Sequence, residues 1–67
     1  MDITLNNRPQ FFDENRLTIA EILKLKKFSF KMLVIKVNGK LIRKNQYDAQ
    51  EVFDGDNVQI IHLISGG

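Results

Sequence analysis

The sequence predicts an α+β fold in which a mixed five-stranded sheet carries one main helix packed on one face. One amphipathic helical stretch lies between two pairs of short apolar segments, and a last apolar segment follows a polar stretch. A single helix between two hairpins cannot cover both faces of a sheet, so it covers one. With 67 residues the chain is expected to form one domain, 1–67, with a flexible C-terminal tail at 64–67.

The first two strands are expected in the N-terminal hairpin. In MDITLN, Ile3 and Leu5 alternate with polar residues, which is typical of a half-buried strand. The stretch NNRP has turn chemistry, so a second short strand is expected to begin at Gln10, in QFF.

The helix is expected in LTIAEILKLKKF, residues 17–28. Thr18 is the expected N-cap, and Glu21 three residues later completes a capping box. Ile19, Ile22 and Leu23 share one helical face, which predicts that this face packs on the sheet.

The second half of the chain predicts another hairpin and a final strand. MLVIKVNGKLI contains the Asn38–Gly39 pair, a strong hairpin signal between two apolar runs. Residues 43–53 are polar and irregular, with a short helical turn expected among them, and Asp54–Asp56 forms a tight turn. NVQIIHLI then supplies the last strand. If the first and last strands lie side by side in the middle of the sheet, the arrangement is a β-grasp, or ubiquitin-like, fold.

The charged residues are unevenly distributed along the chain. From Lys24 to Lys44 all charged residues are basic, whereas the charged residues after Asn45 are all acidic. The basic stretch is interpreted either as an ordinary solvated surface, which we favour, or as a dedicated binding patch. Its basic residues are Lys24, Lys26, Lys27, Lys31, Lys36, Lys40, Arg43 and Lys44.

Residues suited to catalysis or metal binding are scarce. The chain has no cysteine, which excludes disulfides, thiolate chemistry and a Cys-rich zinc site. His62 is the only histidine, and Ser65 three residues along an extended strand points to the opposite face. No metal site is expected, because one histidine and scattered carboxylates do not form a converging ligand set. Without an evident membrane span or signal peptide, a cytoplasmic location is expected.

The last strand predicts a partner-binding surface. Val58 and Ile60 share one face, and Ile61 and Leu63 point to the other. In a two-layer fold that other face is open to water, and an exposed apolar cluster marks a surface for a partner. The alternative is a bulge that turns Ile61 and Leu63 inward.

The chain ends in ISGG, and this tail suits covalent modification by another enzyme. Gly66 and Gly67 have no side chain, so Ser65 and Gly66 are expected to thread into a narrow partner site. The Gly67 carboxylate is ionised at neutral pH and can attack an activated phosphate. The resulting acyl-adenylate has a good leaving group, and a sulfur or nitrogen nucleophile can then displace AMP.

Taken together, the short first strand, the capped helix LTIAEIL, the hairpin VIKVNGKLI, the stretch RKNQYD and the end DGDNVQIIHLISGG make the chain resemble the bacterial ubiquitin-like sulfur carriers of thiamine biosynthesis. The resemblance covers the whole chain. That family commonly has Val-Pro-Arg followed by an aromatic residue after the second hairpin. Here the run is Ile42-Arg43-Lys44, with Tyr47 as the aromatic residue and no proline.

The resemblance implies that the chain is a protein cosubstrate and not an enzyme, with no bound cofactor. An adenylating, E1-like enzyme with ATP and magnesium would activate Gly67. A sulfur donor such as a cysteine desulfurase would convert it to a thiocarboxylate, which gives its sulfur to thiazole synthase.

Other functions stay open at this stage. Carriers for molybdopterin synthesis, cysteine synthesis or tRNA thiolation share the fold and the tail. The basic stretch Lys24–Lys44 would suit a non-covalent RNA-binding β-grasp module, although the chain lacks an aromatic-rich RNA motif. A plain interaction domain would depend on Ile61 and Leu63 alone.

Overall fold

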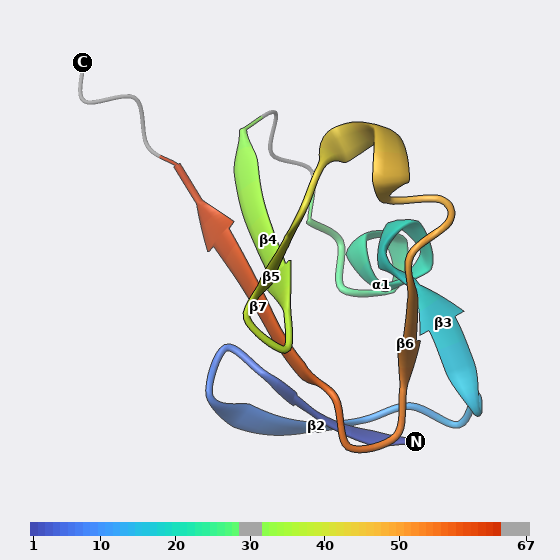
Figure 1. Cartoon of the computed structure of the whole chain (residues 1–67). Helices are drawn as coiled ribbons and strands as arrows, with labels where there is room; N and C mark the ends of the chain where they lie inside the picture. Colours follow the sequence, from blue (N-terminus) through green and yellow to red (C-terminus); the bar gives the residue numbers. More distant parts are fainter. Residues whose placement is uncertain (29–31, 64–67) are drawn as a thin grey trace.

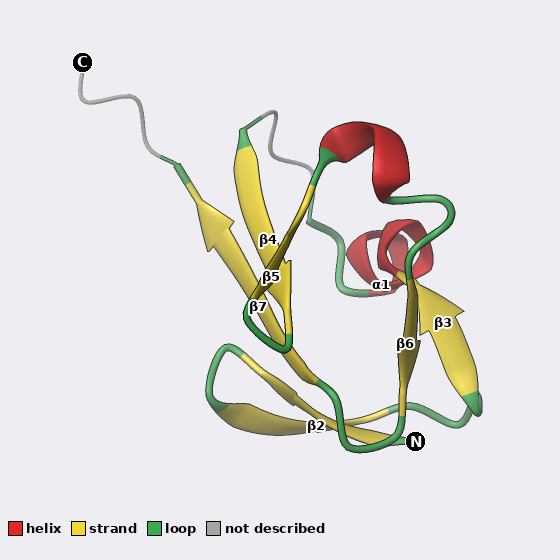
Figure 2. Ribbon diagram, viewed as in Figure 1, coloured by secondary structure: helices red, strands yellow, loops and turns green. Residues whose placement is uncertain are grey.

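A computed structural model describes residues 1–28 and 32–63 of the chain. Five strands form a mixed sheet in the order β2-β1-β7-β4-β5, and α1 lies on one face of it (Figures 1 and 2). The first and last strands, β1 and β7, are parallel neighbours inside the sheet, so the predicted β-grasp fold is confirmed. In chain order the elements are β1 (Asp2–Leu5), β2 (Arg8–Phe11), β3 (Arg16–Thr18), α1 (Ile19–Leu25), β4 (Leu33–Val37), β5 (Lys40–Ile42), the 3₁₀ turn η1 (Lys44–Gln46), β6 (Glu51–Phe53) and β7 (Asn57–His62).

The core lies between α1 and the inner face of the sheet. Alternation along the strands decides which side chains face it, because successive strand residues point to opposite faces. Ile19 and Ile22 of α1 are fully buried there, as their helical spacing predicts. The buried apolar residues are Met1, Ile3, Leu5, Phe12, Leu17, Ile19, Ile22, Ile35, Val37, Ile42, Val52, Val58 and Ile60.

The first hairpin is tighter than the sequence predicts. Its turn consists of Asn6 and Asn7 alone, both with positive φ (51° and 66°), and the ladder closes at Leu5↔Arg8. The prediction that NNRP is the turn and that the strand begins at Gln10 is therefore wrong by two residues. Asparagine adopts positive φ more readily than most residues, which allows a two-residue turn. Pro9 is tolerated because β2 is an edge strand, where an amide hydrogen is dispensable.

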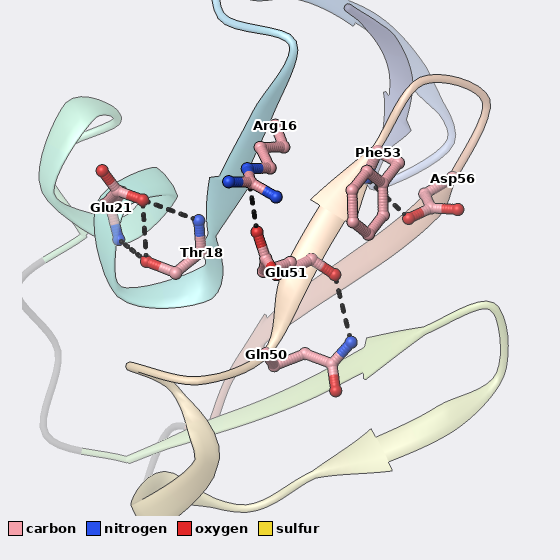
Figure 3. Close-up of polar contacts among 7 residues, drawn as sticks. All are labelled: Arg16, Thr18, Glu21, Gln50, Glu51, Phe53 and Asp56. Atoms are coloured by element: carbon pink, nitrogen blue, oxygen red, sulfur yellow. Dashed lines mark hydrogen bonds and ion pairs between the residues drawn. The ribbon is translucent and has the colours of Figure 1, made fainter.

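The structure has a second, two-stranded sheet that the sequence analysis did not predict. β3 pairs with β6 in antiparallel register, with Leu17 opposite Val52. At the edge of this pair, the exposed Arg16 Nε lies 3.2 Å from Glu51 Oε2 (Figure 3). Each strand has three residues, too few for an alternating pattern, and they are far apart in the chain. The short helical turn expected within residues 43–53 is present as η1.

The N-terminus of α1 has the predicted capping box (Figure 3). The Glu21 backbone amide donates to Thr18 Oγ1 at 3.2 Å, and the Thr18 backbone amide donates to Glu21 Oε1 at 2.9 Å. The hydrogen bond from the Thr18 backbone, followed by that from its hydroxyl, holds the pKa of Glu21 below its usual value. Both bonds favour the ionised carboxylate, so the capping box is strongest when Glu21 is charged.

Thr18→Ala is expected to lower the free energy of unfolding by about 1 kcal/mol at neutral pH, because it removes the side-chain acceptor of the N-cap. Since the folded-state pKa of Glu21 is lowered, its contribution is complete above the unfolded pKa of about 4.3 and is lost as pH falls through the folded value. Thr18→Ala keeps the backbone amide that bonds Glu21 and removes the hydroxyl bond to it, so the difference between wild type and Thr18→Ala should shrink in acid by the contribution of that hydroxyl bond. Urea unfolding at pH 7 and pH 3 tests this; an equal difference at both pH values would contradict it.

The C-terminus of α1 comes earlier than predicted. The helix ends at Leu25, and Lys27 adopts a left-handed conformation with φ 59°, so the expected extension to Phe28 is wrong. The Phe28 amide donates to the Leu23 carbonyl at 2.9 Å and the Lys27 amide to the Lys24 carbonyl at 3.2 Å. These two bonds form a Schellman motif, which normally carries glycine where Lys27 stands. With neither glycine nor proline near the end of α1, a helix end at Leu25 could not be predicted from the sequence.

Candidate functional site

The region around the end of β7 is the candidate site, because this strand leads into the tail. All five residues of β4 pair with β7, from Val37↔Val58 to Leu33↔His62. β1 pairs with it only at Thr4↔Asn57 and Leu5↔Val58. Beyond Val58, then, β4 is the only described strand that supports β7.

Asn6 continues the support of β7 where β1 stops. Its side-chain Nδ2 donates to the Ile60 carbonyl at 3.1 Å, and the Ile60 amide donates to Asn6 Oδ1 at 2.7 Å. The side-chain amide thus takes the place of a strand residue and satisfies both backbone groups of Ile60. The sequence analysis assigned Asn6 only to a turn, since nothing local indicates that its side chain bonds β7.

Asn38 holds the other end of β7. The Asn57 amide donates to Asn38 Oδ1 at 2.8 Å, and Asn38 Nδ2 donates to Asp56 Oδ1 at 3.0 Å. The other Asp56 oxygen accepts from the Phe53 amide at 2.9 Å (Figure 3). The β4–β5 turn is thereby joined to the turn before β7, so the strand is fixed at its start and at Ile60.

The Asp54-Gly55-Asp56 segment is a turn, as predicted, and its carboxylates accept hydrogen bonds from amide groups of the turn and of neighbouring segments. Gly55 has φ 87°, and Asp54 Oδ1 accepts from the Asp2 backbone amide at 2.6 Å. In the described residues, no group of three or more His, Asp or Glu side chains could hold a metal ion.

Ile61 and Leu63 lie on the open face of the sheet, as predicted. Their side chains are 48% and 44% exposed, whereas Ile60 is 4% exposed. Val34 lies opposite Ile61 in the ladder, so it shares the outer face, and Leu41 lies opposite Lys36 on that same face. The orientation of Ile61 and Leu63 is confirmed, and their role in partner binding stays a prediction.

The predicted tail residues Ser65, Gly66 and Gly67 lie outside the described residues, as does the whole tail 64–67. Their roles, and the division into a domain and a tail, stay predictions. His62 is exposed at the end of β7. Within the described ranges, no helix is long and apolar enough to cross a membrane.

The basic stretch lies on the surface. Of its described cations, Lys36 is half-buried and the others are exposed. Lys26 Nζ donates to Gln10 Oε1 at 2.9 Å. Arg43 follows the last residue of β5, and Lys44 is the first residue of η1. A binding role for the stretch as a whole stays untested.

A helix on one face of a five-stranded mixed sheet, with parallel first and last strands and β7 at the centre of the sheet, defines a ubiquitin-like β-grasp protein. The model of the ThiS family matches residues 3–67. The chain therefore belongs to the ThiS family.

Individual proteins agree with this assignment. The chain is 26% identical over 65 residues to the sulfur carrier protein ThiS of Bacillus subtilis (strain 168), covering 97% of this chain and 98% of that protein. It is also similar to the crystal structure of the thiamine biosynthesis protein ThiS from Geobacter metallireducens, with a TM-score of 0.89, 29% identity and full coverage of both chains. The solution structure of a thiamine biosynthesis protein from the same organism gives a TM-score of 0.81 at 29% identity, covering 100% of this chain and 88% of the other.

Proposed function

We propose that this chain is a sulfur carrier of thiamine biosynthesis and that its Gly67 carboxylate carries the sulfur as a thiocarboxylate. The observation that supports this most is the family match, which runs from residue 3 through Gly66 and Gly67. The names of the similar proteins favour thiamine biosynthesis over the sister pathways of molybdopterin, cysteine or tRNA thiolation.

The proposed chemistry has three steps, and an E1-like adenylating enzyme supplies the nucleotide and magnesium for the first. The Gly67 carboxylate attacks the α-phosphorus of ATP, and pyrophosphate leaves as the acyl-adenylate forms. A persulfide, supplied ultimately by a cysteine desulfurase, then adds to the acyl carbon and AMP leaves. A thiol reduces the S–S bond of the resulting acyl disulfide, which forms a new disulfide with the sulfur donor and releases the thiocarboxylate. The thiocarboxylate passes its sulfur to thiazole synthase, so the chain acts as a cosubstrate and not as a catalyst, within the cytoplasm.

The anchored β7 suits this role because it fixes the point from which the tail departs. Asn38 holds the start of the strand, and Asn6 holds it at Ile60. From Leu63, the four residues 64–67 reach at most about 14 Å when fully extended. An enzyme that acts on Gly67 therefore lies close to the end of β7, where Ile61 and Leu63 are exposed on the outer face. We propose this face as its docking surface, with Ser65 and Gly66 threading into its active site.

The adenylation step gives the direct test of this function. When the full chain is mixed with the E1-like enzyme of the same organism and Mg-ATP, pyrophosphate is expected to be released in proportion to the chain added. A chain lacking Gly66 and Gly67 serves as the control and should release none above background. Equal pyrophosphate release from both chains would contradict the proposal.

A further inference from the structure

A groove of about 930 Å³ lies at the end of the molecule from which β7 leaves the sheet. It runs between the C-terminal end of α1, the start of β4 and the segment that connects β5 to η1. Leu23, Phe28 and Tyr47 form its inner wall and are partly buried against the core. The Schellman motif at the end of α1 holds Leu23 and Phe28 together in this wall.

The rim of the groove includes an open strand edge at Leu33. The Met32 carbonyl accepts from the Leu63 amide, and the Asn38 amide donates to the Asn57 carbonyl. Between residues 32 and 38, the even-numbered residues therefore direct their backbone N–H and C=O groups toward β7. Odd-numbered residues direct theirs toward β5, because the direction alternates along a strand. The β4–β5 ladder ends at Ile35↔Ile42, and the chain then diverges toward η1 (Figure 1). Among the described strands, none pairs with Leu33 on that side.

The same rim is positively charged. Arg43 and Lys44 line the groove, and its described lining contains no carboxylate. The one ion pair that the described residues form joins Arg16 and Glu51, so in this part of the chain no carboxylate is paired with Arg43 or Lys44. A ligand that enters the groove is therefore favoured if it carries negative charge at that rim.

We propose that the groove binds an extended segment of a protein partner by strand addition. The segment pairs with the backbone of Leu33, places an apolar side chain against Leu23 and Phe28, and directs a carboxylate to Arg43 and Lys44. An open edge supplies the main-chain bonds, and the apolar wall and the basic rim supply specificity. The ligand that fits these three features is an extended segment that carries both an apolar side chain and a carboxylate.

The position of the groove indicates which partner supplies the strand. Leu63 lines the groove and lies four residues before Gly67, so an enzyme that holds Gly67 is within about 14 Å of it. We therefore assign the strand to the adenylating enzyme. Only this choice of partner rests on the proposed function.

Binding of the full chain to the adenylating enzyme of the same organism, without ATP, tests the proposal. The double variant Arg43→Glu/Lys44→Glu should bind roughly tenfold more weakly than wild type or worse, because it reverses the charge of the rim. The matched control Arg8→Glu/Lys40→Glu makes the same change in net charge at exposed residues that do not line the groove. It should bind nearly as well as wild type.

Amide hydrogen exchange tests the strand pairing itself. The Leu33 amide should exchange at least about tenfold more slowly in the complex than in the free chain, because it becomes hydrogen-bonded to the added strand. The Lys36 amide, which faces β7, should be protected in both states and is the internal control. Thr18, remote from the groove, should show no change.

Four results would overturn the proposal: no binding of the wild-type chain, equal losses in the two double variants, unchanged exchange at Leu33 in the complex, or concentration-dependent protection of Leu33 in the free chain. The last would show that a second copy of this chain occupies the groove. A failure of the proposed Gly67 chemistry would give a different result. The chain would bind the enzyme and Leu33 would be protected in the complex, but no pyrophosphate would be released.

Discussion

Gly67→Trp is expected to abolish sulfur loading while leaving the fold intact. A large side chain on the reacting residue prevents the close approach of the carboxylate to the nucleotide, which a residue without a Cβ permits. The buried core residues of the described structure all lie between Met1 and Ile60, so a change at position 67 should leave the stability of the protein unchanged. Intact mass after incubation with the adenylating enzyme, Mg-ATP and a sulfur donor measures the loading, and urea unfolding measures the stability.

Asn45→Trp is the matched control for Gly67→Trp. Asn45 is an exposed residue of η1 that does not line the groove, so the same bulky side chain should leave both loading and stability nearly unchanged. If Gly67→Trp were loaded at the rate of Asn45→Trp, the reaction would not require a residue without a side chain at position 67.

Ile60→Ala is expected to cause the largest loss of stability among single changes in β7. Ile60 is 4% exposed, and truncation of a buried isoleucine to alanine costs about 2–5 kcal/mol. A chain of this size has a net stability of only about 3–5 kcal/mol from its core, so the variant should be largely unfolded at 37 °C. Circular dichroism during urea unfolding gives the measurement.

Ile61→Ala is the paired control, since it makes the same chemical change one residue later on the opposite face. Ile61 is 48% exposed, so its loss should lower the free energy of unfolding by less than about 1 kcal/mol. If Ile61 belongs to the docking surface, this variant should nevertheless bind the adenylating enzyme more weakly. Equal destabilisation by the two changes would mean that the register of β7 is wrong, because a shift by one residue exchanges the faces.

The larger features of the fold follow from local sequence patterns. Alternation placed Val58 and Ile60 in the core and Ile61 outside it, and helical spacing placed Ile19 and Ile22 against the sheet. Thr18 and Glu21 marked the start of α1 correctly. These features are predictable because each depends on residues a few positions apart, whose period the backbone fixes.

The features that the sequence did not predict depend on contacts between distant segments. The β3–β6 pair joins three-residue strands that have no pattern of their own. The Asn6 side chain bonds a backbone 54 positions away, and only the parallel placement of β1 and β7 brings the two together. Lys27 ends α1 through tertiary packing of Phe28, in a conformation that its own propensity does not favour.

The candidate site was predictable only where it depends on local sequence patterns. The exposure of Ile61 and Leu63 followed from alternation, whereas the groove beside Leu33 requires β5 to end at Ile42 and the chain to turn into η1. The role of Gly67 came from the diglycine end and from the family resemblance, and residues 64–67 lie outside the described structure. Experiments on the tail therefore carry the most weight.

The intact mass of the unaltered chain, before and after incubation with the adenylating enzyme, Mg-ATP and a hydrosulfide donor, tests the carrier hypothesis most directly. The hypothesis predicts a gain equal to the replacement of one oxygen atom by sulfur, which fragmentation locates at Gly67 and which disappears when ATP is omitted. An unchanged mass with an enzyme that loads the Bacillus subtilis carrier, or a sulfur atom located at any other residue, would contradict it.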